Sequence, residues 1–164
     1  MNDRVLRMFR EAHGRLHDAD ILARSVDTYS DSQAILRILG LEILLKCALV
    51  LSGQTPKNSH NYRNLWLGLP GSVRQQVLEV AAARMPGIAD LSNLEEKLDW
   101  WRFVFERARY HYEFYENYTL QEQTELGELW MALGAPDHEA VVQYFPSELH
   151  CLIEGLTAYV ERAA

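Results

Sequence analysis

Arg107 and His111 are the residues whose types and spacing best suit acid–base chemistry. Three residues separate them, so on an α-helix both side chains would lie on one face. An imidazole can move a proton at a ribose 2′-hydroxyl while a guanidinium neutralises the charge that develops on the phosphorus. The pair therefore predicts a site for RNA cleavage. The alternative is that both residues border a second packing surface within the chain.

A second charged pair, Glu42 and Lys46, lies in the most apolar stretch of the sequence. Glu precedes Lys by four positions, which is the favourable order on a helix. Their neighbours are Leu, Ile, Cys and Ala, and buried charges persist only when they are paired or useful. The pattern indicates either an ion pair at the rim of the core or the polar lining of a cleft that binds a nucleotide or RNA.

Two more charged pairs follow along the chain at the same spacing of four. Arg102 precedes Glu106, and Arg109 precedes Glu113. On one continuous helix they would form a ladder of salt bridges, and each exposed pair would contribute about 0.3 to 0.5 kcal/mol.

Metal binding has one candidate, the stripe of His13, His17 and Asp20, since histidines four apart on a helix can hold one ion. No second segment offers a fourth ligand at comparable spacing. We therefore expect surface histidines, with Asp20 paired to Arg24. The sequence also lacks phosphate-binding glycine loops, dinucleotide fingerprints and zinc-finger spacings, so neither a metal nor a cofactor is predicted.

The elements that must position these residues are helices. Apolar residues recur at steps of three and four, and nowhere do they alternate as in strands. Stop signals at glycine and proline separate the segments, so the sequence predicts an all-α, up-and-down helical bundle. We expect one domain, 1–164, with its core in 3–118 and a helical extension in 119–164. The expected helices cover 5–26, 31–52, 60–67, 72–85, 92–115, 125–133 and 147 onward.

The helix expected at 92–115 has two apolar faces. One is the core seam, and the other carries Trp100, Phe103 and Phe114 beside Arg107 and His111. A helix with a spare apolar face favours contact with a second chain. These three aromatic residues therefore predict the interface of a two-fold homodimer.

Three segments in this order resemble the HEPN superfamily of small helical-bundle proteins. Residues 39–53 contain the Glu-x3-Lys step of Glu42 and Lys46, and residues 60–70 begin with the His-Asn helix start of such proteins. Residues 105–116 look like the Arg-Tyr-x-Tyr-Glu variant found in some members. We assign a binding role to Glu42, Lys46, Arg102, Arg109, Tyr112 and Glu113.

The resemblance implies a bundle that often dimerises. In many members it also implies a metal-independent endoribonuclease of toxin–antitoxin or antiviral defence systems. Such members carry Arg and His four to six residues apart on a late helix. Here Arg107 and His111 have three residues between them, and Arg102 and His111 have eight.

Composition narrows the classes of partner. There are 16 Lys and Arg against 23 Asp and Glu, which gives a net charge of −7 and excludes a uniformly basic coat for nucleic acids. The N-terminal residues lack the apolar core of an export signal, and the apolar run from 35 to 51 carries three charges. We expect a cytoplasmic protein without a membrane partner.

Two functions remain open at this point. One is a HEPN-like ribonuclease that acts as a dimer, with Arg107 and His111 as catalytic residues and RNA as substrate. The other is a catalytically inactive helical module that binds an antitoxin or another protein. The acidity and the departure from the usual Arg–His spacing favour the module, whereas the presence of the pair favours the nuclease.

Overall fold

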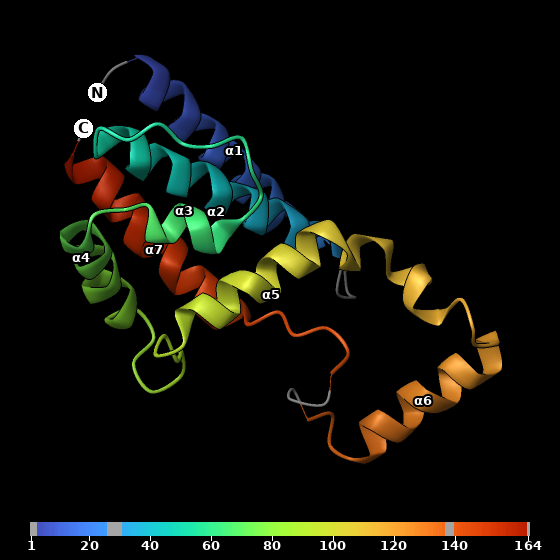
Figure 1. Ribbon diagram of the computed structural model, residues 1–164. Coiled ribbons are helices and arrows are strands. Elements are labelled where there is room, and N and C mark those ends of the chain that lie inside the picture. Colours follow the sequence, from blue (N-terminus) through green and yellow to red (C-terminus); the bar gives the residue numbers. More distant parts are fainter. Residues whose placement is uncertain (1–2, 26–30, 137–139, 164) are drawn as a thin grey trace.

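The computed structural model describes residues 3–25, 31–136 and 140–163, and in these ranges the chain is helical without any strand (Figure 1). The predicted all-α fold is confirmed. The elements are α1 (Asp3–Ser25), α2 (Asp31–Leu51), α3 (Tyr62–Leu67), α4 (Gly71–Ala82), α5 (Leu94–Glu106), the 3₁₀ helix η1 (Ala108–Tyr115), α6 (Leu120–Ala132) and α7 (Pro146–Arg162).

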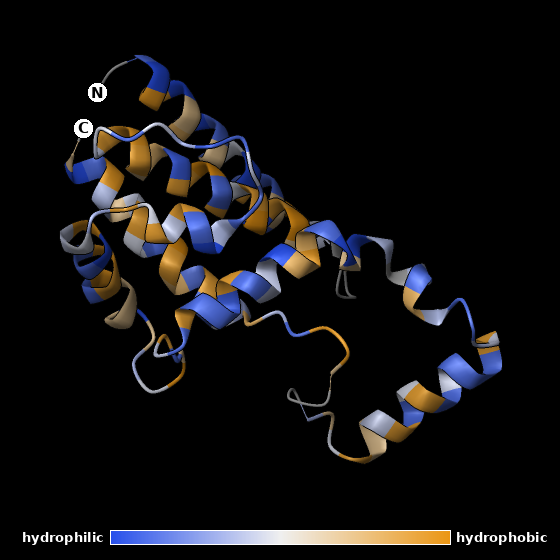
Figure 2. Cartoon of the chain, viewed as in Figure 1, coloured by the Kyte–Doolittle hydropathy of each residue, from blue (hydrophilic) through white to orange (hydrophobic). Residues whose placement is uncertain are grey.

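The bundle is built around α2. Helix α1 packs along one side of α2, α7 packs along another, and α4 covers α7. Short α3 lies between α2 and α5. Figure 2 shows hydrophobic residues along α2 and α7, whereas α1 is more hydrophilic. The largest fully buried side chains come mostly from α2, α3, α5 and α7, and they include Leu44, Tyr62, Trp101 and Leu152.

Two glycines have roles that other residues could not fill. Gly155 brings α7 against α4, because a Cβ at this position would lie 2.5 Å from the carbonyl oxygen of Val77. Gly53 follows the end of α2 with a φ of 76°, a left-handed conformation that favours glycine. This stop after α2 is where the sequence predicts it.

Several predicted helix starts are displaced, and the largest shift is in α6, which begins five residues earlier than expected. Helix α3 begins at Tyr62, because Asn61 accepts a hydrogen bond from the Asn64 backbone N–H at 2.9 Å and caps the helix. Helix α4 begins at Gly71 after Pro70 and without a side-chain cap, so Ser72 is not its cap. Helix α5 begins at Leu94, two residues later than expected.

Helix α5 also ends early, and the expected continuous helix over 92–115 is wrong. Its last α-helical residue is Glu106, and Arg107 leaves helical geometry with φ −121° and ψ −50°. The chain continues as η1, which is kinked at Tyr110 (φ −108°, ψ 50°). The run from 110 to 115 is rich in aromatic residues, which have low helix propensity.

Beyond η1 the chain forms an arm, defined here as residues 116–136 and 140–145. Helix α6 in this arm stands apart from the other helices (Figure 1), and none of its thirteen residues, all of them described, is buried. Its N-terminus carries a reciprocal capping box between Thr119 and Glu122. Local hydrogen bonds therefore define this helix, and the core of the bundle does not.

The arm returns to the bundle on α5. The Trp101 indole N–H donates to the Tyr144 carbonyl oxygen at 2.6 Å, and the Lys97 ammonium lies 5.4 Å from the centre of the Phe145 ring. Helix α7 then enters the core with eight buried residues. The segment 119–164, expected as an extension, thus contains both the outlying α6 and a central core helix.

Candidate functional site

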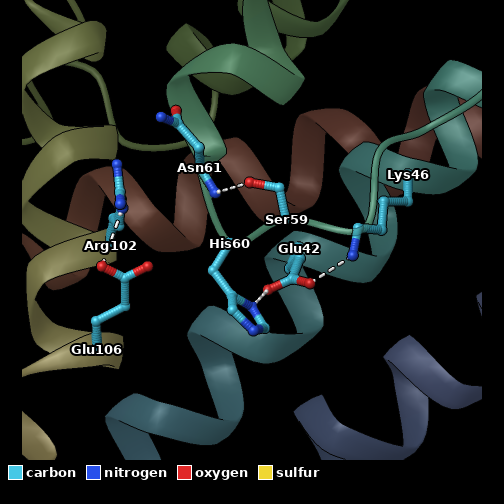
Figure 3. A network of polar contacts seen from close by, with 7 residues as sticks. All are labelled: Glu42, Lys46, Ser59, His60, Asn61, Arg102 and Glu106. Atoms are coloured by element: carbon cyan, nitrogen blue, oxygen red, sulfur yellow. Dashed lines mark hydrogen bonds and ion pairs between the residues drawn. The ribbon is translucent and has the colours of Figure 1, made fainter.

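The Glu42 carboxylate is the centre of a polar cluster in an otherwise apolar region. It is 4% exposed, and each of its oxygens has a partner. Oε1 lies 2.6 Å from Lys46 Nζ, and Oε2 lies 2.8 Å from His60 Nδ1 (Figure 3). The predicted Glu42–Lys46 pair is therefore present, and His60 is a third member that sequence reasoning missed.

The connection between α2 and α3 delivers His60 to this carboxylate. After Gly53 the chain runs back along α2, and the Asn61 backbone N–H donates to Ser59 Oγ at 3.1 Å. The same Asn61 caps α3, which fixes the backbone on the other side of His60. Figure 3 shows His60 pointing from this segment toward Glu42 on α2.

The contact with Glu42 sets the tautomer of the His60 ring. A carboxylate can only accept a hydrogen bond, so the proton of the neutral ring lies on Nδ1 and the lone pair on Nε2. The side chain is 50% exposed, and its ring lies 4.8 Å from the ring of Phe105. A buried carboxylate that orients a half-exposed imidazole can serve proton transfer.

Tyr62 adds a buried hydroxyl beside the carboxylate. Its side chain is fully buried. Burial and then the negative charge of Glu42 raise the pKa of Tyr62, so the hydroxyl stays protonated. The cluster therefore holds a protonated hydroxyl close to Glu42.

Two arginine side chains lie near the cluster, one on α5 and one in η1. On α5, Arg102 Nε pairs with Glu106 Oε2 at 3.1 Å, as predicted, and Figure 3 shows this pair across from His60. The Arg109 guanidinium lies 5.3 Å from the centre of the Phe105 ring and 5.0 Å from that of Tyr110. Among the described residues Arg109 forms no ion pair with Glu113, contrary to the expected ladder, since the kink breaks the helical register between them.

The structure brings together four of the six residues assigned to binding: Glu42 and Lys46 on α2, Arg102 on α5 and Arg109 in η1. Tyr112 and Glu113 are exposed further along η1. Phe105, which contacts both His60 and Arg109, links the two sides. The missed residue, His60, carried a sequence signal, because it opens the segment that follows the Glu-x3-Lys helix.

Arg107 and His111 do not occupy one α-helical face. Arg107 is exposed at the junction between α5 and η1, and the side chain of His111 lies outside the described residues. Because Arg107 is the non-helical residue between α5 and η1, no single helix carries both residues. Their catalytic assignment stays a prediction.

The aromatic residues expected at an interface form a row along α5 and η1. The ring of Phe103 lies 5.6 Å from that of Trp100 and 5.8 Å from that of Phe114. All three side chains are half-buried. Trp100 and Phe103 also line an open groove of about 820 Å³ between α3, α4 and α5.

The alternative metal stripe on α1 has other contacts. The ring of His13 packs edge-on against Phe9 at 4.4 Å, and Asp20 pairs with Arg37 of α2 at 2.7 Å, where Arg24 was expected. Within the described residues, no three His, Cys, Asp or Glu side chains are grouped to hold a metal ion. Nor does any helix in these ranges have the length and apolarity to cross a membrane.

Comparisons with protein-family models, with curated proteins and with solved structures found no match to this chain.

Proposed function

We propose that this protein is a metal-independent endoribonuclease in which His60 transfers the proton and Glu42 orients the His60 ring. The observation that carries the proposal is the 2.8 Å contact between the buried Glu42 carboxylate and Nδ1 of the half-exposed His60. The HEPN-like segments support the same substrate class, since Glu42, Lys46 and His60 are the residues that carry the resemblance. A place in a bacterial defence or toxin–antitoxin system is part of this proposal.

The chemistry requires one proton acceptor and compensation of negative charge. His60 Nε2 accepts the proton of the ribose 2′-hydroxyl, and the 2′-oxygen forms a bond to phosphorus. The P–O5′ bond then breaks, which leaves a 2′,3′-cyclic phosphate and a 5′-oxygen that takes a proton from solvent. General base catalysis of this kind contributes about 10²- to 10⁴-fold in rate.

Arg109 is the cation best suited to the phosphate. Lys46 and Arg102 are already paired with carboxylates, whereas Arg109 contacts the rings of Phe105 and Tyr110. A guanidinium held by aromatic faces keeps its donors free for two phosphate oxygens. Arg109 thus stabilises the charge that develops as the 2′-oxygen attacks.

The proposal includes two copies of the chain in contact. Support comes from the half-buried row of Trp100, Phe103 and Phe114 along α5 and η1. Aromatic residues of this kind are enriched at the centre of protein interfaces. The row lies on the same two elements as Arg102 and Arg109, so a dimer would place two sites near one interface.

The test is cleavage of labelled single-stranded and structured RNA in EDTA. We expect cleavage by the wild type, and a loss of about 10²- to 10⁴-fold in His60→Ala. Glu42→Gln should also lose activity, because the amide no longer fixes the tautomer of His60.

His111→Ala is the matched control, because it removes the other histidine considered for catalysis. Full activity in His111→Ala together with loss in His60→Ala supports the proposed site. The reverse result would transfer catalysis to Arg107 and His111. If the wild type cleaves none of the RNAs, the nuclease proposal is wrong.

A second candidate function is a helical module that binds another protein. The observation that favours it is the apolar side of α6, on which Leu126 and Leu129 are 44% and 58% exposed. A contiguous exposed apolar face is typical of an interaction surface. Binding of a partner without any RNA cleavage would support this candidate.

A further inference from the structure

Two exposed tyrosine rings lie next to each other beyond the polar cluster. Tyr110 and Tyr112 are 42% and 69% exposed, and their ring centres are 6.4 Å apart at an angle of 79°. On an α-helix, residues two apart point to different sides. The break after Glu106 and the kink at Tyr110 therefore allow both rings to stand on the same side of η1.

A chain of short contacts connects these rings to the proposed proton acceptor. The ring of His60 lies 4.8 Å from Phe105, and Arg109 lies 5.3 Å from Phe105 and 5.0 Å from Tyr110. The order along the surface is thus imidazole, guanidinium and tyrosine. A nucleotide whose phosphate meets Arg109 would have its neighbouring bases at the tyrosine rings.

We propose that Tyr110 and Tyr112 form a stacking platform that selects unpaired nucleotides of RNA. This inference rests on the proposed function and names its substrate class more narrowly. An exposed aromatic ring can stack on any unpaired base, whereas the bases of a duplex are already stacked on one another and closed to it. Arg109 between the platform and His60 holds the backbone of the same strand.

The charge of the protein agrees with this mode of recognition. The chain carries a net charge of −7, so attraction over a broad surface does not hold RNA to it. Affinity must then come from a few local contacts, and base stacking is a contact that needs no positive charge. The two tyrosine rings provide this stacking contact beside Arg109.

The test uses RNA that the protein can bind but cannot cut. A fluorescently labelled strand with every 2′-hydroxyl methylated has no nucleophile, and it is compared with the same strand annealed to its complement. Fluorescence anisotropy at one fixed salt concentration gives the two affinities. We expect tighter binding of the single strand by the wild type.

Substitution of the platform should weaken only single-strand binding. Tyr112→Ala should lose roughly 5- to 150-fold in affinity, the range typical of one lost stacking contact. Tyr112→Phe keeps the ring and should bind as the wild type does. Tyr118→Ala is the matched control, since Tyr118 is also exposed but its ring contacts Tyr115, whereas that of Tyr112 contacts Tyr110.

Three results would overturn the platform: equal affinity of the wild type for the single strand and the duplex, unchanged binding in Tyr112→Ala, or an equal loss in Tyr118→Ala. Each of them leaves the nuclease proposal standing if the wild type cleaves RNA. Conversely, selective binding of the single strand without cleavage of unmodified RNA would support the platform and refute the nuclease.

Discussion

Helices α2 and α6 are both rich in leucine, yet they meet opposite surroundings. Leu41, Leu44 and Leu45 of α2 are fully buried, whereas α6 buries none of its residues. Apolar helices are normally stabilised by packing rather than by propensity. The difference teaches that apolar content shows which helices need a neighbour, but not whether the same chain supplies it.

Equivalent leucine truncations in the two helices should give the largest contrast. Leu44→Ala creates a cavity in the core and should lower the free energy of unfolding by about 2.7 to 5 kcal/mol. Leu129→Ala removes an exposed side chain and should change it by less than about 0.5 kcal/mol. Urea denaturation at low protein concentration measures both. An equal cost at Leu129 would show that α6 is packed in solution.

Charged substitutions can decide which region joins two copies. Phe103→Glu places a charge in the middle of the aromatic row and should weaken a dimer by about 2 kcal/mol or more, which is roughly 30-fold in the dissociation constant. Leu129→Glu on α6 is the matched variant in the arm. Light scattering over a range of concentrations gives both constants. A monomer in the wild type would refute the dimer, and a loss confined to Leu129→Glu would move the interface to α6.

The smallest effect should be local and confined to the arm. The Thr119 backbone N–H and then its hydroxyl lower the pKa of Glu122 below the model-peptide value of 4.5. The stabilisation of α6 by this capping box is therefore complete above pH 4.5 and is lost as the pH falls through the lowered pKa.

Hydrogen exchange of the α6 amides checks this, with α2 as the reference helix. We expect protection of α6 to fall with acidification before that of α2. Thr119→Ala removes the hydroxyl but keeps the backbone N–H, so it should reduce the pH dependence without abolishing it, and it should remove about 1 kcal/mol of local stability. If α6 and α2 lose protection together, the capping box does not control the arm.

Several features were predictable because they depend on neighbours in the sequence. The apolar periodicity predicted the helices, Gly53 predicted the end of α2, and the spacing of Glu42 and Lys46 predicted their pair. Each depends on side chains within about one turn of helix or on one backbone conformation. Local physics is sufficient for such features.

The remaining features depend on contacts between distant residues. His60 meets Glu42 only because the connection after α2 folds back, which no periodicity reveals. The early end of α5 was missed because the apolar steps of three and four continue to Tyr115, beyond the break. The contacts of Arg109 with Phe105 and Tyr110 after the break leave no trace in that pattern. The central place of α7 was missed, because apolar periodicity shows that a helix has a face to bury but not which helices pack together.

Both cysteines of the chain, Cys47 and Cys151, are fully buried, and burial raises the pKa of the Cys47 thiol to about 12. Since only the exposed thiolate reacts with maleimides, the folded protein offers them no native attachment point. A single cysteine introduced on α6, such as Gln121→Cys, would then take up one spin label or fluorophore without removal of either native thiol. Distances measured between two such labels would report where the arms of two copies lie.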